Sequence, residues 1–287
     1  MDNNLLGYIE LDTGPKLITP TNDIFLNWTF NKEEYWEELR MIANILYSAY
    51  IELYGDTKIT LIEDEIAITT QFPFYKDVSS SEPNKLDMRI ESIKKVDFFD
   101  FQNNMRPEIP ISIRSTKYLG FLLSRGEDKQ QASAWLLNGT IPELLHGKTF
   151  ANYILMDEQD HHPHPIDANI LYVDLKKLAK ESSQAGELAR VLTAVENDPK
   201  DEDVKKILHS LKQSFNEFKN CTEVKNIMTR AEALRSEGRV EGLAEGEAKG
   251  LAEKARKAAF KMLRKGYQNH EIADILEMPI SWVDSLA

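Results

Sequence analysis

The chain has 287 residues, of which 42% are hydrophobic, which is enough for one large core or two modest ones and excludes a disordered or fibrous protein. Its one cysteine, Cys221, excludes an internal disulfide and a cysteine-based zinc cluster. The formal net charge of −12 excludes a uniformly basic nucleic-acid binder, so phosphate contacts would need local basic surface or bridging metal ions.

The first twenty residues lack the basic start and the apolar run of a signal peptide. No stretch reaches the roughly 18–20 uninterrupted apolar residues that cross a bilayer. A single cysteine also fits a reducing compartment. We therefore expect a soluble, cytoplasmic protein without membrane partners.

The first third of the chain alternates between helical and strand patterns. Residues 1–20 carry scattered apolar side chains without a clear period and are expected to form an extended arm. Between Lys32 and Tyr54 the apolar residues recur at spacings of three and four, and Gly55 follows as a stop, which predicts an amphipathic helix. The β-branched segment 58–72 predicts one strand or two short ones, closed by Pro73.

A hairpin is predicted from two alternating segments, Lys85–Ser92 and Val96–Gln102, with a turn near residues 93–94. In an antiparallel hairpin, the numbers of paired residues sum to a constant. This register places Asp87 directly opposite Asp100 on one face of the sheet, where facing Cβ atoms lie about 4.5–5.5 Å apart.

Two unpaired carboxylates at that separation repel each other. A divalent cation between them would remove the repulsion and create a site for hydrolytic chemistry. Gln102 lies two residues after Asp100 and so shares its face. Two solvated acids on an exposed sheet face, one paired with Arg89 or Lys85, are the simpler interpretation of the spacing alone.

The segments that follow predict further helices and strands. Pro107 and Pro110 mark a loop, and Ile111–Arg125 has a helical pattern. Gln131–Asn138 suggests a second helix, ended by Gly139. Two short apolar runs with strand character come next, at Phe150–Met156 and Asn169–Asp174.

After Asp174 every segment has a helical pattern. The expected helices are Leu175–Glu181, Ala185–Glu196, Asp201–Asn220 and a last one from Glu223 onward. The order of elements predicts an α/β core followed by a helical C-terminal extension.

Glycines recur every fourth residue in the tail, at Gly238, Gly242, Gly246 and Gly250. Each costs a helix about 1 kcal/mol relative to alanine, so a helix here would be weak alone. The segment is too charged for lipid. We interpret residues 230–254 as a flexible or partner-dependent helical linker, with self-association through the small-residue stripe as the second interpretation.

Residues 255–287 are expected to form a small module of three short helices that resembles a helix-turn-helix. Gly266 can end the first helix, Asn269 can cap the second, and Pro279 begins the third. Six cations precede Gly266, namely Lys254, Arg256, Lys257, Lys261, Arg264 and Lys265. The last helix is short and acidic, which favours a packing or homo-oligomerisation unit over a DNA reader.

Two other polar clusters are open to more than one interpretation. The segment His161–His164 offers imidazoles, the commonest transition-metal ligands, but a solvated loop is favoured because the histidines flank a proline in a polar stretch. The run Glu63–Glu65 is expected to face water, although one of its acids could complete a metal shell.

Taken together, three features resemble the PD-(D/E)XK nuclease family transposases, also called recombination-promoting nucleases. The first is the segment Thr21–Phe30 that leads into the long helix. The second is Asp87 followed by Phe99-Asp-Phe-Gln102, where the family typically has an acid on one strand and Ile-Glu-x-Gln on the next. The third is the Glu-Gly tail with its terminal element Ile272-Ala-Asp-Ile-Leu276.

The resemblance implies a restriction-endonuclease-like α/β core, with a mixed sheet flanked by helices, that binds Mg²⁺ (or Mn²⁺) and cleaves DNA. Asp87 and Asp100 would be the metal ligands, with Asp100 in the place of the usual glutamate. Gln102 would complete the catalytic set in the place of the motif's lysine. Arg114 and Tyr118 resemble the family's Arg-x-x-x-Tyr pair and would bind the substrate, although Arg114 could instead pair with an acid of the hairpin.

The domains expected from pattern and resemblance together follow the chain in order. They are an N-terminal arm at 1–20, a nuclease-like domain at 21–183, a helical extension at 184–229, the glycine-rich linker at 230–254 and the terminal module at 255–287. Two functions stay open. One is a metal-dependent DNA endonuclease associated with transposition or recombination of mobile DNA, and the other is a catalytically degenerate protein of the same fold that acts as a DNA-binding or protein-interaction module.

Overall fold

The computed structural model describes residues 6–12, 14–55, 59–63, 65–75, 83–103, 110–124, 129–156, 159 and 168–286. Within these ranges the side chains of residues 23, 70–75, 83–87, 121–124 and 230–249 are not described. The chain forms two compact units, residues 1–225 and residues 226–287.

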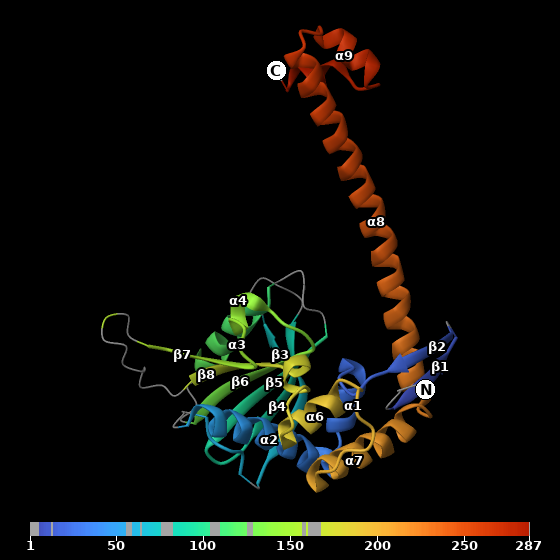
Figure 1. The fold of residues 1–287 in the computed structure, drawn as a ribbon. Coiled ribbons are helices and arrows are strands. Elements are labelled where there is room, and N and C mark those ends of the chain that lie inside the picture. The colour runs from blue at the N-terminus through green and yellow to red at the C-terminus, as the bar shows by residue number, and fades with distance from the viewer. Residues whose placement is uncertain are drawn as a thin grey trace. The chain divides into compact units, whose positions relative to one another are not determined.

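A mixed six-stranded sheet, in the order β3-β4-β5-β6-β8-β7, forms the centre of the first unit (Figure 1). Its strands are β3 (Ala67–Tyr75), β4 (Pro83–Glu91), β5 (Lys95–Gln102), β6 (Gln130–Leu137), β7 (Phe150–Ile154) and β8 (Ala168–Asp174). The neighbours β5, β6 and β8 are parallel, while the pairs β3–β4, β4–β5 and β7–β8 are antiparallel. The structure confirms the expected α/β fold with a mixed sheet, flanking helices and a helical C-terminus.

The hairpin predicted from alternation is present as β4 and β5. Met88 pairs with Phe99 and Glu91 pairs with Val96, so the paired numbers have the expected constant sum. The turn is closed by a hydrogen bond from the Ser92 N–H to the Lys95 carbonyl at 2.8 Å. Strand order and register therefore agree with the sequence prediction.

Two predictions for the sheet region were wrong, a helix predicted in place of a strand and a strand end. Segment 131–138 is the buried strand β6 and not a helix, because a central parallel strand is apolar on both faces and has no alternation to distinguish it from a buried helix. Pro73 lies inside β3 and does not end it. Since β3 is at the edge of the sheet, the missing N–H of a proline can be tolerated there.

The N-terminal residues form a hairpin of their own, in place of the expected extended arm. Strands β1 (Gly7–Leu11) and β2 (Gly14–Ile18) pair antiparallel, with Ile9 and Ile18 buried. Helix α1 (Asp23–Phe30) follows, and the Asn22 side chain accepts a hydrogen bond from the Phe25 N–H at its start.

Helices cover both faces of the sheet (Figure 1). The long amphipathic helix is present as the short 3-10 turn η1 (Glu33–Tyr35) and α2 (Trp36–Tyr54), ended at Gly55. Its Tyr47 ring lies 6.0 Å from Phe99 of β5, so α2 covers the face of odd-numbered β5 residues. Helix α3 (Ile111–Ser124) covers the opposite face.

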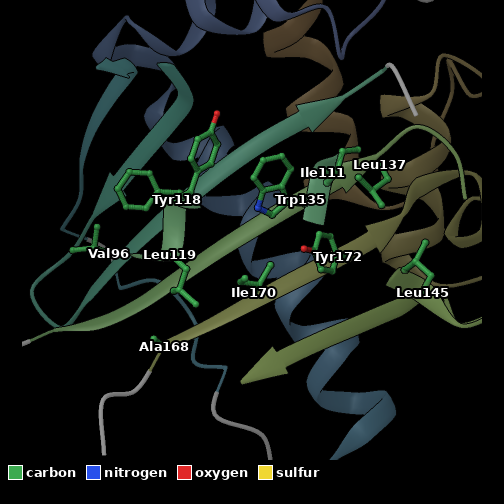
Figure 2. Close-up of a cluster of buried hydrophobic side chains, with 11 residues drawn as sticks. Val96, Ile111, Tyr118, Leu119, Trp135, Leu137, Leu145, Ala168, Ile170 and Tyr172 are labelled. Carbon is green, nitrogen blue, oxygen red and sulfur yellow. The ribbon is translucent and has the colours of Figure 1, made fainter. Parts of the chain in front are cut away.

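The core between α3 and the sheet is a cluster of buried apolar side chains (Figure 2). It includes Val96 and Phe98 of β5, Trp135 and Leu137 of β6, and Ile170 and Tyr172 of β8. These residues alternate along their strands, as expected for side chains that share one face. The even-numbered residues of β5 therefore point toward α3.

The remaining helices of the first unit are short except for the last one. They are α4 (Pro142–Leu145), α5 (Leu175–Leu178), α6 (Gln184–Leu192) and α7 (Glu202–Phe218). Side chains of Asp174, Ser183 and Asp201 cap the starts of α5, α6 and α7. Helices α5 and α7 start within the expected ranges, and α6 starts one residue before its range. A buried hydrogen bond of 2.8 Å between the Thr29 and Ser214 hydroxyls joins α1 to α7.

The second unit contains most of α8 (Thr222–Arg264) together with α9 (Asn269–Ile275) and α10 (Ile280–Asp284). The backbone of the glycine-rich segment is helical and belongs to α8. The last turns of α8 pack against α9 and α10 around Ala259, Ile272, Ala273 and Val283. Gln268 caps α9, one residue before the expected cap at Asn269.

Among the helices that the structure describes, none has the length and apolar character needed to span a membrane.

Candidate active site

The candidate site lies at the carboxyl end of β5. Asp100 and Gln102 are even-numbered residues of this strand and share the face that α3 covers. Because β5 and β6 are parallel, the helix between them runs back along the sheet, so the first turns of α3 lie beside the last residues of β5. This geometry brings Arg114, in the first turn of α3, next to the two β5 residues.

Arg114, Asp100 and Gln102 form a closed set of polar contacts. Arg114 Nη2 lies 3.2 Å from Asp100 Oδ2, and Arg114 Nη1 donates a hydrogen bond of 3.0 Å to Gln102 Oε1. Gln102 Nε2 in turn donates to Asp100 Oδ1. Both carboxylate oxygens of Asp100 therefore have a donor, one from the strand and one from the helix.

Two aromatic residues support the guanidinium from the side. The Tyr118 ring stacks on the Trp135 ring at a centroid distance of 5.4 Å (Figure 2). Arg114 Cζ lies 5.3 Å from the Trp135 ring centroid, within the range of a cation–π interaction. Arg114 Nη2 also donates to the Tyr118 hydroxyl at 3.5 Å. The pair Arg114 and Tyr118, one helical turn apart, thus lies in the same cluster as Asp100.

Burial distinguishes this cluster from a surface ion pair. Asp100 is 2% exposed, while the Arg114 side chain is 25% exposed and leads from the carboxylate toward solvent. A buried carboxylate is tolerated only when it is paired and hydrogen-bonded. The interpretation of Asp100 as a solvated surface acid was therefore wrong. The pairing of Arg114 with an acid of the hairpin, which was the alternative role for this arginine, is observed.

Asp87 lies in β4, but its side chain is outside the described part of the structure. The observed register pairs Met88 with Phe99. The described pairs of β4 with β5 end there, one residue before the expected pair of Asp87 and Asp100. The role of Asp87 as a metal ligand stays a prediction.

The structure describes only part of the two other clusters of possible metal ligands, the histidine segment 161–164 and the acidic run 63–65. His161–His164 and Asp64 lie outside the described residues. Glu63 forms an ion pair of 2.7 Å with Lys94, whose side chain is 80% exposed, which fits the expected water-facing run. Among the described side chains, no group of three or more His, Cys, Asp or Glu is close enough to hold a metal ion.

A polar network that the sequence analysis missed lies just beyond Gln102. Asn103 Nδ2 donates to the Thr21 carbonyl at 2.6 Å, and the Thr21 hydroxyl donates to Asn103 Oδ1 at 3.0 Å. Asn138, directly after β6, also donates to Asn103 Oδ1, at 3.1 Å. A polar residue immediately after an apolar strand was the available signal, because the carboxyl ends of parallel strands meet at one edge of the sheet.

A second buried polar cluster lies on the opposite face of β5. Lys95 Nζ lies 3.2 Å from Asp97 Oδ2 and donates to the Thr60 carbonyl at 2.8 Å. Tyr47 donates to Asp97 Oδ1 at 3.0 Å, and its ring lies 3.9 Å from Lys95 Nζ. Burial raises the pKa of Asp97, although Lys95 and Tyr47 act in the opposite direction. This cluster connects α2 to the sheet.

Comparisons of the chain with models of protein families, with curated proteins and with solved structures gave no match.

Proposed function

We propose that the chain is a metal-dependent DNA endonuclease, with its site at the carboxyl end of β5. The observation that carries this proposal is the convergence of Asp100, Gln102, Arg114 and Tyr118, four residues singled out from the sequence, in one partly buried cluster. Strand register and helical spacing are independent features, and both lead to the same position.

The arrangement supports binding of a phosphodiester. Arg114 presents a planar, permanently charged guanidinium whose forked donors match two phosphate oxygens. The Trp135 ring and the Tyr118 hydroxyl hold it from one side. The guanidinium is also the more exposed member of its ion pair, so a phosphate can reach it from solvent.

The donor set fits a magnesium or manganese ion. Mg²⁺ is typically bound through one or two carboxylates and keeps several waters, so Asp100 and Asp87 would suffice as protein ligands. Carboxylate oxygens also favour these hard cations over zinc. When bound, the ion would supply an acidified water and a counter-charge for the phosphate.

Each of the four residues would then have a separate role. Asp100, together with Asp87, would hold the cation, and the Arg114 guanidinium would bind a non-bridging oxygen of the scissile phosphate. Gln102, which hydrogen-bonds to both Asp100 and Arg114, would keep the carboxylate oriented. Water would attack phosphorus and lose a proton to solvent, while the bond from phosphorus to the leaving sugar oxygen breaks and that oxygen takes a proton from solvent. Tyr118, whose hydroxyl accepts a hydrogen bond from Arg114, would orient the guanidinium.

The second candidate is a catalytically degenerate protein of the same architecture that binds DNA or another protein. One observation favours it: Arg114 and Gln102 already donate to the two oxygens of Asp100, so each oxygen has a hydrogen-bond donor from the protein. In that case the cluster would be a structural connection between β5 and α3.

Cleavage of supercoiled plasmid with Mg²⁺, Mn²⁺ or EDTA tests the proposal. We expect cleavage by the native chain with either ion and none with EDTA, and loss of at least about 100-fold in rate for Asp87→Ala and for Asp100→Asn, because transition-state stabilisation by one such group is typically of this size. A control should replace an acid that has no structural role. Asp174 is unsuitable because its side chain caps the start of α5. Glu143→Gln, an exposed acid in α4, is the matched control and should cleave like the native chain.

Metal binding separates the two candidates. Calorimetric titration of Mn²⁺ should give one site whose affinity falls for both Asp87→Ala and Asp100→Asn if the chain is a nuclease. Absence of cleavage by the native chain, or metal binding that does not depend on these two acids, would favour the degenerate protein. Equal cleavage by native and variant chains would overturn the assignment of the site.

A further inference from the structure

A stripe of cations runs along the last three turns of α8. Residues 254–265 contain six Lys or Arg and no Asp or Glu. Five of these cations fall within an arc of about 100° on the helix, given a rotation of about 100° per residue. This cationic stripe consists of Lys254, Lys257, Lys261, Arg264 and Lys265.

The stripe is exposed and faces away from the core of its own unit. All five side chains are exposed. The Lys257 side chain is 75% exposed and forms an ion pair with Glu253, which is 65% exposed. The side of α8 that packs on α9 and α10 carries Ala259, Met262 and Leu263, roughly opposite the stripe around the helix.

This positive surface stands out against the rest of the chain. Residues 226–287 contain ten Lys or Arg and ten Asp or Glu, so the formal charge of −12 lies entirely on residues 1–225. The stripe is therefore a local concentration of positive charge in an acidic protein. Such concentrations attract polyanions, of which nucleic acids have the highest charge density per length.

Two observations favour a nucleic acid over an anionic membrane. A membrane-surface helix inserts a continuous apolar face next to its cations, but Ala259, Met262 and Leu263 of this part of α8 pack against α9 and α10. This packing leaves Phe260, 38% exposed, as the one exposed large apolar side chain among the described residues of this part. The stripe from Lys254 to Arg264 is also about 15 Å long, a length along which duplex DNA carries roughly nine phosphates.

We propose that the cationic stripe of α8 binds the phosphate backbone of duplex DNA without reading its sequence. The short helix α10, which a helix-turn-helix would use for recognition, carries Asp284 and no Lys or Arg. Affinity without base readout is what phosphate contacts alone provide. The biological use that we assign to the stripe, holding the substrate of the β5 site, rests on the proposed endonuclease function.

The test uses the full chain and a fluorescently labelled duplex, with EDTA present so that no cleavage occurs. The variant Lys254→Gln/Lys261→Gln/Lys265→Gln removes three charges from the stripe. The matched control Lys176→Gln/Lys180→Gln/Lys206→Gln removes three charges from exposed lysines of the first unit. All six side chains are exposed, so circular dichroism and thermal melting should be the same for the three chains.

We expect the stripe variant to bind at least about tenfold more weakly in anisotropy titrations, and the control to bind within about twofold of the native chain. As KCl is raised from about 50 to about 200 mM, the slope of log K against log salt should be shallower by about 2 to 3 for the stripe variant, because each lost phosphate contact removes about 0.9. Two duplexes of equal length and unrelated sequence should bind equally well.

Native-like affinity of the stripe variant, or an equal loss in the control, would overturn the proposal. Binding of the native chain to phosphatidylserine vesicles but not to the duplex would also overturn it, in favour of a lipid surface. Two assays on the native chain separate this result from that on the endonuclease: the stripe should bind the duplex in EDTA whether or not the chain cleaves plasmid with Mg²⁺.

Discussion

Arg114 Nη2 lies 3.2 Å from Asp100 Oδ2, and this contact connects the first turn of α3 to the end of β5. A cation that binds Asp100 must displace the guanidinium or share the carboxylate with it. Under the proposed function, the strength of the contact would therefore set both the stability of the free protein and its affinity for metal.

Replacing Arg114 with alanine should separate these two effects. Asp100 is 2% exposed, so loss of this donor should lower the free energy of unfolding by about 2 kcal/mol. Millimolar Mg²⁺ should raise the melting temperature of Arg114→Ala more than that of the native chain, because the cation replaces the missing positive charge.

The control for this experiment is Arg40→Ala, which breaks the ion pair of 2.6 Å between Arg40 and Glu37 on α2. It should give no added response to Mg²⁺. A response of Arg114→Ala no larger than that of Arg40→Ala would show that Asp100 does not take up a cation.

A second prediction concerns Gln102. Gln102→Glu would place a second carboxylate against Asp100, and the like charges favour protonation of the folded state. Because the folded state then holds protons that the unfolded state has released, the stability of this variant should fall relative to the native chain as pH rises from about 4 to about 7. Urea unfolding across this range measures the effect, and added Mg²⁺ should reduce it at neutral pH. Gln102→Leu, which adds no charge, should show no such pH dependence.

A third prediction concerns the buried pair on the opposite face of β5. Lys95→Met leaves the Asp97 carboxylate buried without its cation, which should cost about 3 kcal/mol at neutral pH. Burial already raises the pKa of Asp97, and loss of Lys95 raises it further. A group whose pKa is raised by folding contributes stability at low pH that is lost as pH rises, so Lys95→Met should be closest to the native chain near pH 4.

The double variant Lys95→Met/Asp97→Asn keeps an acceptor for the Tyr47 hydroxyl and removes the buried charge. It should recover most of the lost stability at pH 7 and lose the pH dependence. Denaturant midpoints at both pH values for the single and double variants check this pair of expectations, and a single variant that is equally destabilised at both pH values would contradict them.

Two glycines should respond to alanine in opposite directions. A Cβ at Gly186 in α6 would lie 2.1 Å from the Glu181 carbonyl oxygen, so Gly186→Ala forces α5 and α6 apart and should cost about 2 kcal/mol or more. A Cβ at Gly120 in α3 would meet no atom within 4 Å, and Gly120→Ala should stabilise the protein by about 0.5–1 kcal/mol. Thermal melting of the two variants side by side provides the comparison.

The parts of the fold that could be predicted from the sequence are those set by local patterns. The β4–β5 register followed from alternation about a tight turn, and Arg114 lies four residues before Tyr118, so their common side on α3 follows from helical geometry. The proximity of Arg114 and Tyr118 to Asp100 follows from the position of α3 directly after β5 in the chain. These features need no knowledge of distant contacts.

The parts that could not be predicted depend on position within the sheet. Residues 131–137 are buried on both faces, so no alternation of buried and exposed side chains marked them as a strand, and the position of Trp135 beside Arg114 could not be predicted. Pro73 is compatible with β3 only because β3 is an edge strand, which the sequence does not reveal. The cluster of Lys95 and Asp97 was missed for a related reason, because two buried charges resemble an exposed polar face until the covering helix is known.

Strand β5 carries charges on both of its faces, and this protects the fold against a misaligned hairpin. A shift of β5 by one residue would exchange its faces, moving Lys95 and Asp97 into the apolar cluster under α3 and turning Asp100 away from Arg114. Buried charges would then lack partners in both layers at once, so neither α2 nor α3 could close over the sheet. The charges of β5 therefore select its register during folding, because only the native pairing with β4 allows both α2 and α3 to pack on the sheet.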